Sequence, residues 1–289
     1  MTAETLNILL LSASIALTVG RSIFSKAVSG NPFGTRRFFL VQMLTFGVAA
    51  ILMLLLSLGD VTAVSPLTWL LALLYGGCLL SSQWCYTTAL RGDNTSICAT
   101  VYSFGFFLPA LSGMLFFGEA MTGCKILGLL LLIPALLCSV RGGGCPGKGG
   151  YILPLLIAML SSGGLGLLQK VQQHSPVAGE KNVFLLLSFS IAALVSLAAA
   201  LLPHVKEKAP LPPRHMAAGA AIGLCFGAAN LLNTTLAGRM DSAVFFPVQN
   251  VSVIVLCTLL GMLLYRERLR RRDLGTFVFG IGAILLLNL

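Results

Sequence analysis

The sequence predicts an all-α polytopic membrane protein with ten transmembrane helices in two inverted five-helix repeats. Three observations lead to this prediction: an apolar composition, ten long apolar runs and an internal duplication. Of the 289 residues, 57% are hydrophobic and only 10% are charged, whereas soluble domains carry about 25% charged residues. The chain is therefore expected to reside in a lipid bilayer.

Each apolar run is long enough to form a membrane-spanning helix. The runs hold roughly 17 to 24 residues, enough to cross about 30 Å of hydrocarbon, whereas a membrane β-strand needs only about ten alternating residues. The first run lacks a preceding basic segment and a cleavage site, so we expect a retained span and not a signal peptide. The predicted spans are residues 6–28, 38–58, 67–90, 95–117, 122–140, 151–171, 182–202, 216–237, 243–265 and 273–289.

Two copies of one unit are present in the chain. A shift of 148 positions lays residues 87–119 on residues 235–267 without a gap. The charged matches decide the interpretation, because charged residues are rare in this sequence. We interpret the match as a duplication that covers each half. The shift pairs Arg91 with Arg239, Asp93 with Asp241 and Glu119 with Glu267.

The predicted halves are residues 1–145 and residues 146–289, each a five-helix repeat. The boundary lies in the segment RGGGCPGKGG at 141–150, whose glycines and proline suit a linker better than a helix. Five spans per half is an odd number, so the second half enters the bilayer in the opposite sense to the first. The two halves are therefore predicted to form an inverted repeat.

The basic residues predict an orientation. The net charge is +10, and the basic residues lie mostly in short connections between apolar runs. We interpret them as topology signals and contacts to anionic lipid, and we expect no nucleic-acid partner. Connections after odd-numbered spans carry fourteen Lys and Arg, those after even-numbered spans carry four, and Arg21 lies within the first span. The positive-inside rule then places both termini outside the cytoplasm.

The first half opens with a recognisable motif. The segment GRSIFSK at 20–26, followed by Arg37-Phe38, resembles the opening of EamA-type proteins of the drug/metabolite transporter superfamily. Those proteins carry a Gly and a Lys near the end of the first span and an Arg-Phe pair that opens the second. The second half repeats part of the motif, since Gly164 and Lys170 keep the same spacing, but Lys181-Asn182 replaces the Arg-Phe pair.

Further residues extend the resemblance along the whole chain. Gly118-Glu119 is similar to the Gly-Glu of the family at the end of the fourth span, and Pro247 is similar to its helix-breaking proline. The resemblance implies a secondary carrier whose inverted halves surround a central cavity and expose it alternately to the two sides of the membrane. It also implies cytoplasmic termini, opposite to the orientation that the charge count predicts.

Polar side chains inside the apolar runs are the candidates for contact with a solute. In hydrocarbon such groups are costly unless they face a cavity or another helix. The shift of 148 positions pairs Tyr86 with Thr234, so related polar faces recur in the two halves. The alternative is that these groups form structural hydrogen bonds between helices. The candidate substrate-cavity residues are Gln83, Tyr86, Tyr102, Asn230, Asn233, Gln249, Asn250 and Gln42.

Two lysines are the candidates for binding charge. Lys26 and Lys170 lie nearer to the apolar interior than most basic residues and are suited to an anionic solute or to proton coupling; alternatively they extend to the membrane interface. Glu119 and Glu267 are expected to cap the following helix or to pair with local Lys and Arg. All nine Asp and Glu lie at span ends or in connections.

Other residue patterns argue against an enzyme or a metalloprotein. The three histidines lie in connections, and no zinc-protease or phosphate-binding motif occurs. The eight cysteines have no metal-ligand spacing and are expected to be reduced packing residues. We predict no enzymatic activity, no metal and no cofactor. The glycines at 219, 223 and 227 are expected to let another helix of the same chain approach closely.

Together these observations favour a secondary transporter, expected to export small organic metabolites or drug-like molecules by alternating access. The alternative is a non-transporting membrane scaffold or a translocator of lipid-linked substrates. The expected partners are a small-molecule substrate and the lipid bilayer. The expected location is the cell (plasma) membrane, as a multi-pass monomer or homodimer.

Overall fold

The computed structural model describes residues 3–28, 35–57, 64–89, 98, 101–120, 122–139, 152–202, 212–265 and 271–287. All regular structure in these ranges is helical. The α-helices are α1 (Ala3–Val28), α2 (Thr35–Leu56), α3 (Pro66–Ala89), α5 (Phe107–Phe116), α6 (Gly123–Ser139), α7 (Ile152–His174), α8 (Lys181–Leu201), α9 (Pro213–Ala237), α10 (Ser242–Tyr265) and α11 (Arg271–Leu287), with 3-10 turns η1 (Phe104–Phe106) and η3 (Ala178–Glu180).

The helices coincide with the predicted spans, so the all-α prediction is confirmed for the described residues. The fourth predicted span differs, because the 3-10 turn η1 interrupts it before α5 begins. Pro109 has no amide hydrogen for the carbonyl of Gly105, four residues earlier, so a regular α-helical bond is missing there. A tighter 3-10 turn takes its place. By contrast, α10 continues through Pro247.

Six helical segments in the described ranges are long and apolar enough to cross a membrane, by length and composition. Shorter apolar helices lie at Val101–Phe116, Gly123–Cys138 and Val278–Leu287. The chain is therefore a helical protein of membrane type. The six segments are Glu4–Ser25, Thr35–Leu56, Ile152–His174, Ala178–Leu201, Pro213–Ala237 and Ser242–Leu260.

The bounds of the helices agree with the predicted duplication. Adding 148 to the bounds of α6 gives the bounds of α11, and the same shift moves α3 to within one residue of α9. The copies α6 and α11 also pack on each other. A Cβ at Gly128 would lie 2.8 Å from Leu287, and a Cβ at Gly275 would lie 3.0 Å from the sulfur of Cys138. Early residues of each helix thus meet late residues of the other, so the two copies run antiparallel.

The chain forms two compact units, and each unit contains segments of both sequence halves. Unit 1 comprises Met1–Gly77 and Val171–Gly238, and unit 2 comprises Cys78–Lys170 and Arg239–Leu289. The units therefore do not coincide with the predicted halves 1–145 and 146–289, which remain a prediction about the repeat. The predicted linker at 141–150 lies outside the described residues.

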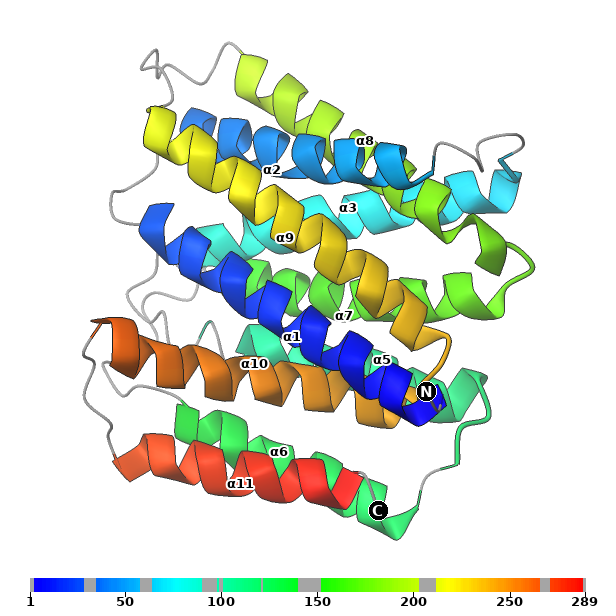
Figure 1. The fold of residues 1–289 in the computed structure, drawn as a ribbon, viewed down its shortest axis with the longest axis vertical. Coiled ribbons are helices and arrows are strands. Elements are labelled where there is room, and N and C mark those ends of the chain that lie inside the picture. Colours follow the sequence, from blue (N-terminus) through cyan, green and yellow to red (C-terminus); the bar gives the residue numbers. More distant parts are fainter. Residues whose placement is uncertain are drawn as a thin grey trace. The chain divides into compact units, whose positions relative to one another are not determined.

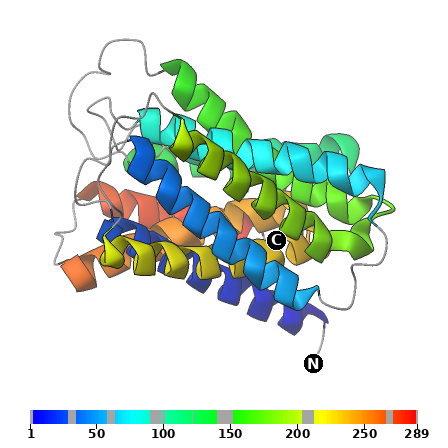
Figure 2. The ribbon, with the colours of Figure 1, turned by 90° about the horizontal axis from the view of Figure 1, so that it is seen from above.

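In unit 1, α2 packs on α8 and on α9, and α9 also packs on α1 (Figures 1 and 2). The predicted close approach at the glycines of α9 is confirmed. A Cβ at Gly223 would lie 2.5 Å from the carbonyl oxygen of Thr45, and one at Gly227 would lie 3.1 Å from Ala49. The ring of Phe226 fills the space next to this contact, with Phe46 at 6.0 Å and Phe189 at 5.7 Å between centroids.

In unit 2, α11 packs on α6 and on α10, and α10 also packs on α5 (Figure 1). A further close contact joins η1 and α7. A Cβ at Gly163 would lie 2.5 Å from the carbonyl oxygen of Gly105, and a Cβ at Gly105 would lie 2.7 Å from that of Met159. Glycine at both positions therefore lets the two backbones touch.

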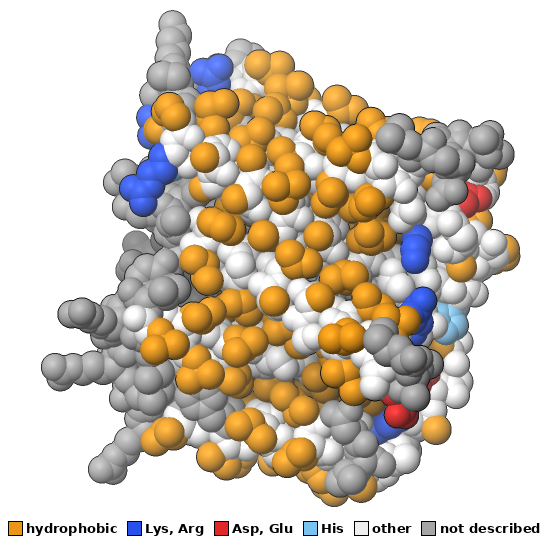
Figure 3. Space-filling view, viewed as in Figure 1, with side chains coloured by type: hydrophobic (Ala, Val, Ile, Leu, Met, Phe, Trp, Pro, Cys, Tyr) orange, Lys and Arg blue, Asp and Glu red, His pale blue; other side chains and the backbone are white. Residues whose placement is uncertain are grey.

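Large hydrophobic side chains cover much of the helix surfaces. Figure 3 shows them over α1 and α9 in unit 1 and over α11 in unit 2. Leu9 of α1 is 55% exposed and Val278 of α11 is 69% exposed. Water would disfavour such extended apolar surfaces, whereas lipid chains accommodate them. The surfaces therefore agree with a membrane environment.

Candidate functional site

A polar seam runs between α1 and α9 in unit 1. The two helices are antiparallel, since Ser14 contacts Asn233 and a Cβ at Gly20 would lie 3.7 Å from the sulfur of Cys225. The hydroxyl of Ser14 donates a hydrogen bond to Oδ1 of Asn233. Ser14 is fully buried and Asn233 is half-buried. Asn233 thus takes part in an interhelical hydrogen bond of the kind expected under the structural alternative.

Asn230 lies one turn before Asn233 and connects α9 to α3. Its Oδ1 accepts a hydrogen bond of 2.6 Å from the hydroxyl of Tyr75, and its Nδ2 donates one of 2.8 Å to the carbonyl of Phe226. Asn230 is 7% exposed and Tyr75 is fully buried. The first contact joins α9 to α3, and the second lies within α9. A role of Asn230 in contact with a solute remains a prediction.

Arg21 belongs to the same seam, although sequence reasoning did not place it among the site residues. Its guanidinium carbon lies 4.2 Å from the centroid of the Phe226 ring, a cation–π contact. Ser14, Thr18 and Arg21 follow the helical spacing that places residues on one face of α1. The signal in the sequence was a charged residue within a predicted span.

A second polar group lies in unit 2 between the end of α3 and the segment before η1. The hydroxyls of Ser82 and Tyr102 form a hydrogen bond of 2.8 Å. The rings of Tyr86 and Tyr102 have centroids 4.6 Å apart. Gln83 follows Ser82 in α3 and is half-buried. Three predicted residues, Gln83, Tyr86 and Tyr102, therefore gather in one small region.

The remaining cavity candidates are distributed over both units. In α10 of unit 2, Gln249 is 7% exposed, and Nδ2 of Asn250 donates a 2.9 Å hydrogen bond to the carbonyl of Phe246 in its own helix. In α2 of unit 1, Gln42 is half-buried. Each unit thus contains part of the predicted set, and whether any of these residues contacts a solute remains a prediction.

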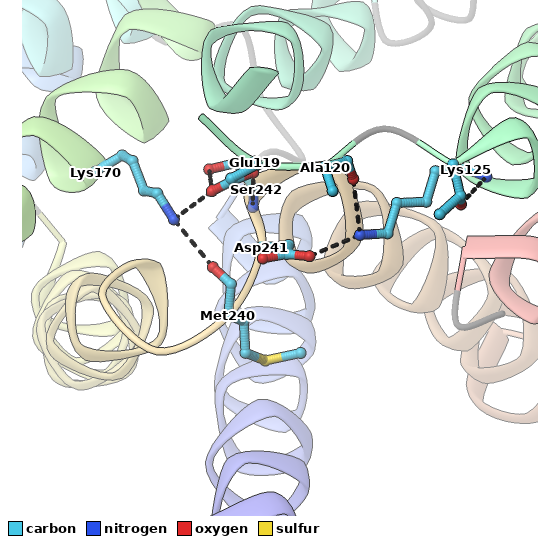
Figure 4. Close-up of polar contacts among 8 residues, drawn as sticks. Glu119, Ala120, Lys125, Lys170, Met240, Asp241 and Ser242 are labelled. Atoms are coloured by element: carbon cyan, nitrogen blue, oxygen red, sulfur yellow. Dashed lines mark hydrogen bonds and ion pairs between the residues drawn. The ribbon is translucent and has the colours of Figure 1, made fainter. Parts of the chain in front are cut away.

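Lys170 forms a buried ion pair with Glu119 in unit 2 (Figure 4). Lys170 Nζ lies 2.6 Å from Glu119 Oε1, and the two side chains are 3% and 9% exposed. The ammonium group also donates a 3.1 Å hydrogen bond to the carbonyl of Met240. Lys170 therefore does not extend to the molecular surface. A buried pair of this kind is sensitive to loss of either partner, because the remaining charge is left uncompensated.

Glu119 also caps the beginning of α10. Its carboxylate accepts a 2.7 Å hydrogen bond from the backbone N–H of Ser242 and a 3.1 Å hydrogen bond from the Ser242 hydroxyl. A carboxylate is favourable there because the first N–H groups of a helix lack helical partners and carry partial positive charge. Glu119 was expected to cap the following helix or to pair with a local Lys or Arg. It caps a helix and pairs with a lysine, but the capped helix is α10 and not α6, and Lys170 is distant in the sequence.

Two glycines make room for this carboxylate. Gly118 has φ +63°, in the left-handed region, and so turns the chain sharply at the end of α5. A Cβ at Gly113 would lie 2.1 Å from Oε2 of Glu119. Any larger residue at 113 would displace the cap. The Gly118-Glu119 pair is thus explained by a turn at Gly118 and by the helix cap that Glu119 forms.

An exposed ion pair lies beside the buried one. Lys125 Nζ lies 2.6 Å from Asp241 Oδ2, with side-chain exposures of 13% and 49%. Lys125 also donates a 3.2 Å hydrogen bond to the carbonyl of Ala120 (Figure 4). The turn before α10 is therefore held by two lysines, one buried and one near solvent.

The described ranges contain no cluster of three or more His, Cys, Asp or Glu that is arranged to hold a metal ion. The seven cysteines in these ranges are free thiols. Lys26 lies in α1, but the structure does not describe its side chain. Glu267 lies outside the described residues.

Comparison with known proteins establishes the fold of the chain. No family model matches the chain. No curated protein matches it either. One solved structure, described only as the crystal structure of a protein, is similar with a TM-score of 0.79 and 17% identity, over 97% of this chain and 96% of the other. At this identity the likeness establishes the fold alone: this chain has the helical architecture of a protein already solved by crystallography.

Proposed function

We propose that the chain is a secondary transporter that exports small organic metabolites or drug-like molecules across the plasma membrane. In this proposal ten helices cross the membrane, and the two five-helix halves form an inverted repeat. The observation that carries the proposal is the packing of α6 on α11. These helices are the two copies of one segment and they run antiparallel, as inverted-repeat carriers require of their related elements.

The resemblance to EamA-type proteins supports the same proposal. It rests on the Gly and Lys of the first and sixth spans, on Gly118-Glu119 and on Pro247. Such a carrier exposes a central site alternately to the two sides of the membrane. We interpret the ion pair between Lys170 and Glu119 as part of the framework of this carrier, because it joins α7, the end of α5 and the start of α10.

Polar side chains within the helices are the candidates for contact with the solute. Asn230 and Gln249 are each 7% exposed and lie within helices that are mostly apolar. In a membrane such side chains occur next to other polar groups or a water-filled path. We propose that the amide of Asn230, in α9 of unit 1, contacts the solute during transport.

A reconstituted flux assay tests this proposal. Purified protein in liposomes should carry at least one compound from a broad library of amino acids, sugars, nucleotides and amines. Asn230→Leu should abolish that flux while leaving the protein folded. Absence of flux for every compound would favour the alternative, a scaffold or a translocator of lipid-linked substrates.

Tyr75→Phe is the matched control for Asn230→Leu. It removes the same 2.6 Å hydrogen bond but keeps the amide. If Asn230 contacts the solute, Tyr75→Phe should retain most of the flux that Asn230→Leu loses. Equal losses in the two variants would assign Asn230 to structural hydrogen bonding and remove it from the site.

A further inference from the structure

We infer that Tyr86, Tyr102 and Gln83 of unit 2 bind a planar aromatic ring that carries a hydrogen-bonding group. This inference rests on the proposed transport function and adds a substrate class to it: uncharged aromatic compounds with an amide or a similar polar group. It concerns unit 2 alone, where the C-terminal part of α3 meets the segment directly before η1.

Two tyrosine rings form the aromatic part of this site. Their centroids are 4.6 Å apart and their planes are inclined by 45°. The hydroxyl of Tyr102 shares a 2.8 Å hydrogen bond with the buried Ser82, which holds the Tyr102 ring in place. Aromatic rings attract one another at such distances in tilted or offset arrangements. A planar ring of a solute can therefore add to the pair by the same interaction.

Tyr86 lies on the buried face of α3. It is four residues after Ser82 and three before Ala89, so the helical period places it between them on one face. Ser82 and Ala89 are at most 1% exposed, whereas Tyr86 is only half-buried. Leu70 and Leu73, which are 53% and 58% exposed, lie on the opposite side of the helix. The exposed part of Tyr86 is therefore not on the side of α3 that faces lipid.

Two polar groups of the site have no hydrogen-bond partner within the part of the chain that the structure describes. They are the side-chain amide of Gln83 and the hydroxyl of Tyr86. The hydroxyls of Thr87 and Thr88, by contrast, donate to carbonyls of α3 itself. An amide or hydroxyl without a partner is costly in hydrocarbon. Since Gln83 and Tyr86 are neighbours on the helix surface, water or a solute has to satisfy both groups.

The aromatic pair is not a requirement of the repeat. Under the predicted duplication, the shift of 148 positions pairs Tyr86 with Thr234 and Tyr102 with Asn250. The second half therefore has no ring at either position. Because one copy of the framework is built without these rings, a ligand explains the pair in the other copy better than the packing of the repeat does.

The charge of the site selects among aromatic compounds. Its side chains, those of Ser82, Gln83, Tyr86 and Tyr102, are all uncharged. The amide and the phenol donate and accept hydrogen bonds, and the ring faces contact an apolar plane. An uncharged ring with a polar group uses both properties. A compact cation would use the ring faces alone, and the experiment below separates the two ligands.

Binding of small probes to the full-length protein in phosphatidylcholine nanodiscs tests the inference, with empty nanodiscs as the blank. Benzamide supplies a planar ring and an amide, and cyclohexanecarboxamide supplies the same amide on a saturated ring. Titrations followed by saturation-transfer NMR measure both affinities. The wild-type protein should bind benzamide about 2- to 10-fold more tightly, the range for an aromatic contact beyond the area that it buries.

Three variants divide the site into its parts. Tyr86→Leu should abolish the preference for benzamide because it removes the ring, whereas Tyr86→Phe should keep the preference. Gln83→Leu should weaken the binding of both amides by the same factor, about 2- to 10-fold, as for loss of one hydrogen bond. A preference that survives in Tyr86→Leu would assign the ring pair to packing and overturn the inference, as would absence of benzamide binding to the wild type.

Two controls keep the test decisive. Trp69→Leu removes an aromatic ring from the beginning of α3, where Trp69 is 51% exposed, and should change neither affinity. The midpoint of thermal unfolding without probe should be similar for all variants. If Tyr86→Leu is poorly folded, Gln83→Leu decides, and unchanged benzamide binding to Gln83→Leu would overturn the inference. Binding of tetramethylammonium without binding of benzamide would indicate a cation site and would overturn it too.

Flux measurements separate this site from the proposed transport. Benzamide binding that depends on Tyr86, without flux of any compound, would contradict transport but not the site. Flux of aromatic compounds that is unchanged in both Tyr86→Leu and Gln83→Leu would contradict the site but not transport.

Discussion

Two helices of this protein begin on a carboxylate that comes from a distant part of the chain. In unit 2, Glu119 caps α10 through the N–H and hydroxyl of Ser242. In unit 1, Glu180 caps α3: it accepts a 3.2 Å hydrogen bond from the N–H of Ser65 and hydrogen bonds from the hydroxyls of Ser65 and Thr68. The capping geometry is similar, but the surroundings of the two carboxylates differ.

The difference lies in how each negative charge is compensated. Glu119 is 9% exposed and has Lys170 at 2.6 Å. Glu180 is half-buried, and the groups of Ser65 and Thr68 that donate hydrogen bonds to it are neutral. A carboxylate near water keeps part of its hydration, so neutral donors suffice, whereas a buried one requires an opposite charge. The lysine at 170 is thus explained by the burial of the cap.

The largest effect should follow from removing the lysine of the buried pair. Lys170→Met leaves Glu119 as an uncompensated buried charge, which typically costs about 3–5 kcal/mol. Chemical or thermal unfolding in detergent measures the loss. The double variant Lys170→Met with Glu119→Gln should regain a large part of it, because no buried charge remains. A double variant as unstable as Lys170→Met would contradict this account of the pair.

The next effect should be steric and confined to unit 1. Gly223→Ala places a methyl group 2.5 Å from the Thr45 carbonyl oxygen, so α9 and α2 must separate. Such overpacking costs about 1–3 kcal/mol. Gly47→Ala is the matched control in α2, since no atom lies within 4 Å of its added Cβ. Gly47→Ala should leave the free energy of unfolding unchanged or raise it, because Ala favours helix over Gly. Equal losses of stability in Gly223→Ala and Gly47→Ala would contradict the close contact.

A smaller effect should follow from removing the half-buried cap at Glu180. Glu180→Ala takes the acceptor away from Ser65 and Thr68, and loss of a helix cap costs about 1 kcal/mol. Unfolding of this variant can be compared directly with that of Glu119→Ala, which should be destabilised more because it leaves Lys170 buried without a carboxylate. A larger loss of stability in Glu180→Ala than in Glu119→Ala would contradict this account of the two caps.

The smallest effect is expected at the exposed ion pair of unit 2. Asp241 is 49% exposed, so solvent screens its attraction to Lys125. Lys125→Gln should change the free energy of unfolding by less than about 1 kcal/mol, as for surface pairs in general. A loss as large as that of Lys170→Met would show that burial does not govern the strength of these pairs.

The sequence predicted the helices well because their signal is local. A run of apolar residues long enough to span a membrane is visible without any knowledge of its neighbours, and the structure places a helix at each such run. The break before α5 was missed, although Gly105 and Pro109 carried the signal for it. The duplication was detected through charged residues, which are informative because they are rare in this chain.

The partners of the polar side chains were much harder to predict. Glu119 was expected to cap the following helix or to pair with a local Lys or Arg. Ser242, whose N–H it accepts, lies 123 residues later in the sequence, and no local pattern identifies it. Arg21 was visible as a charge in a span, yet its position over Phe226 depends on the antiparallel packing of α1 and α9. Such contacts arise from tertiary structure and not from periodicity.

The antiparallel packing of α6 and α11 has a consequence for how this contact evolved. Under the predicted duplication the two helices descend from one segment, and their interface would then be self-complementary, as in a symmetric homodimer. Gly128 of α6 admits Leu287 of α11, and Gly275 of α11 admits Cys138 of α6. Before duplication, a single substitution in the ancestral segment would have altered both sides of such an interface at once. After such a duplication each side would have been free to diverge, so the two sides of the contact could differ in sequence while the helices kept their antiparallel packing.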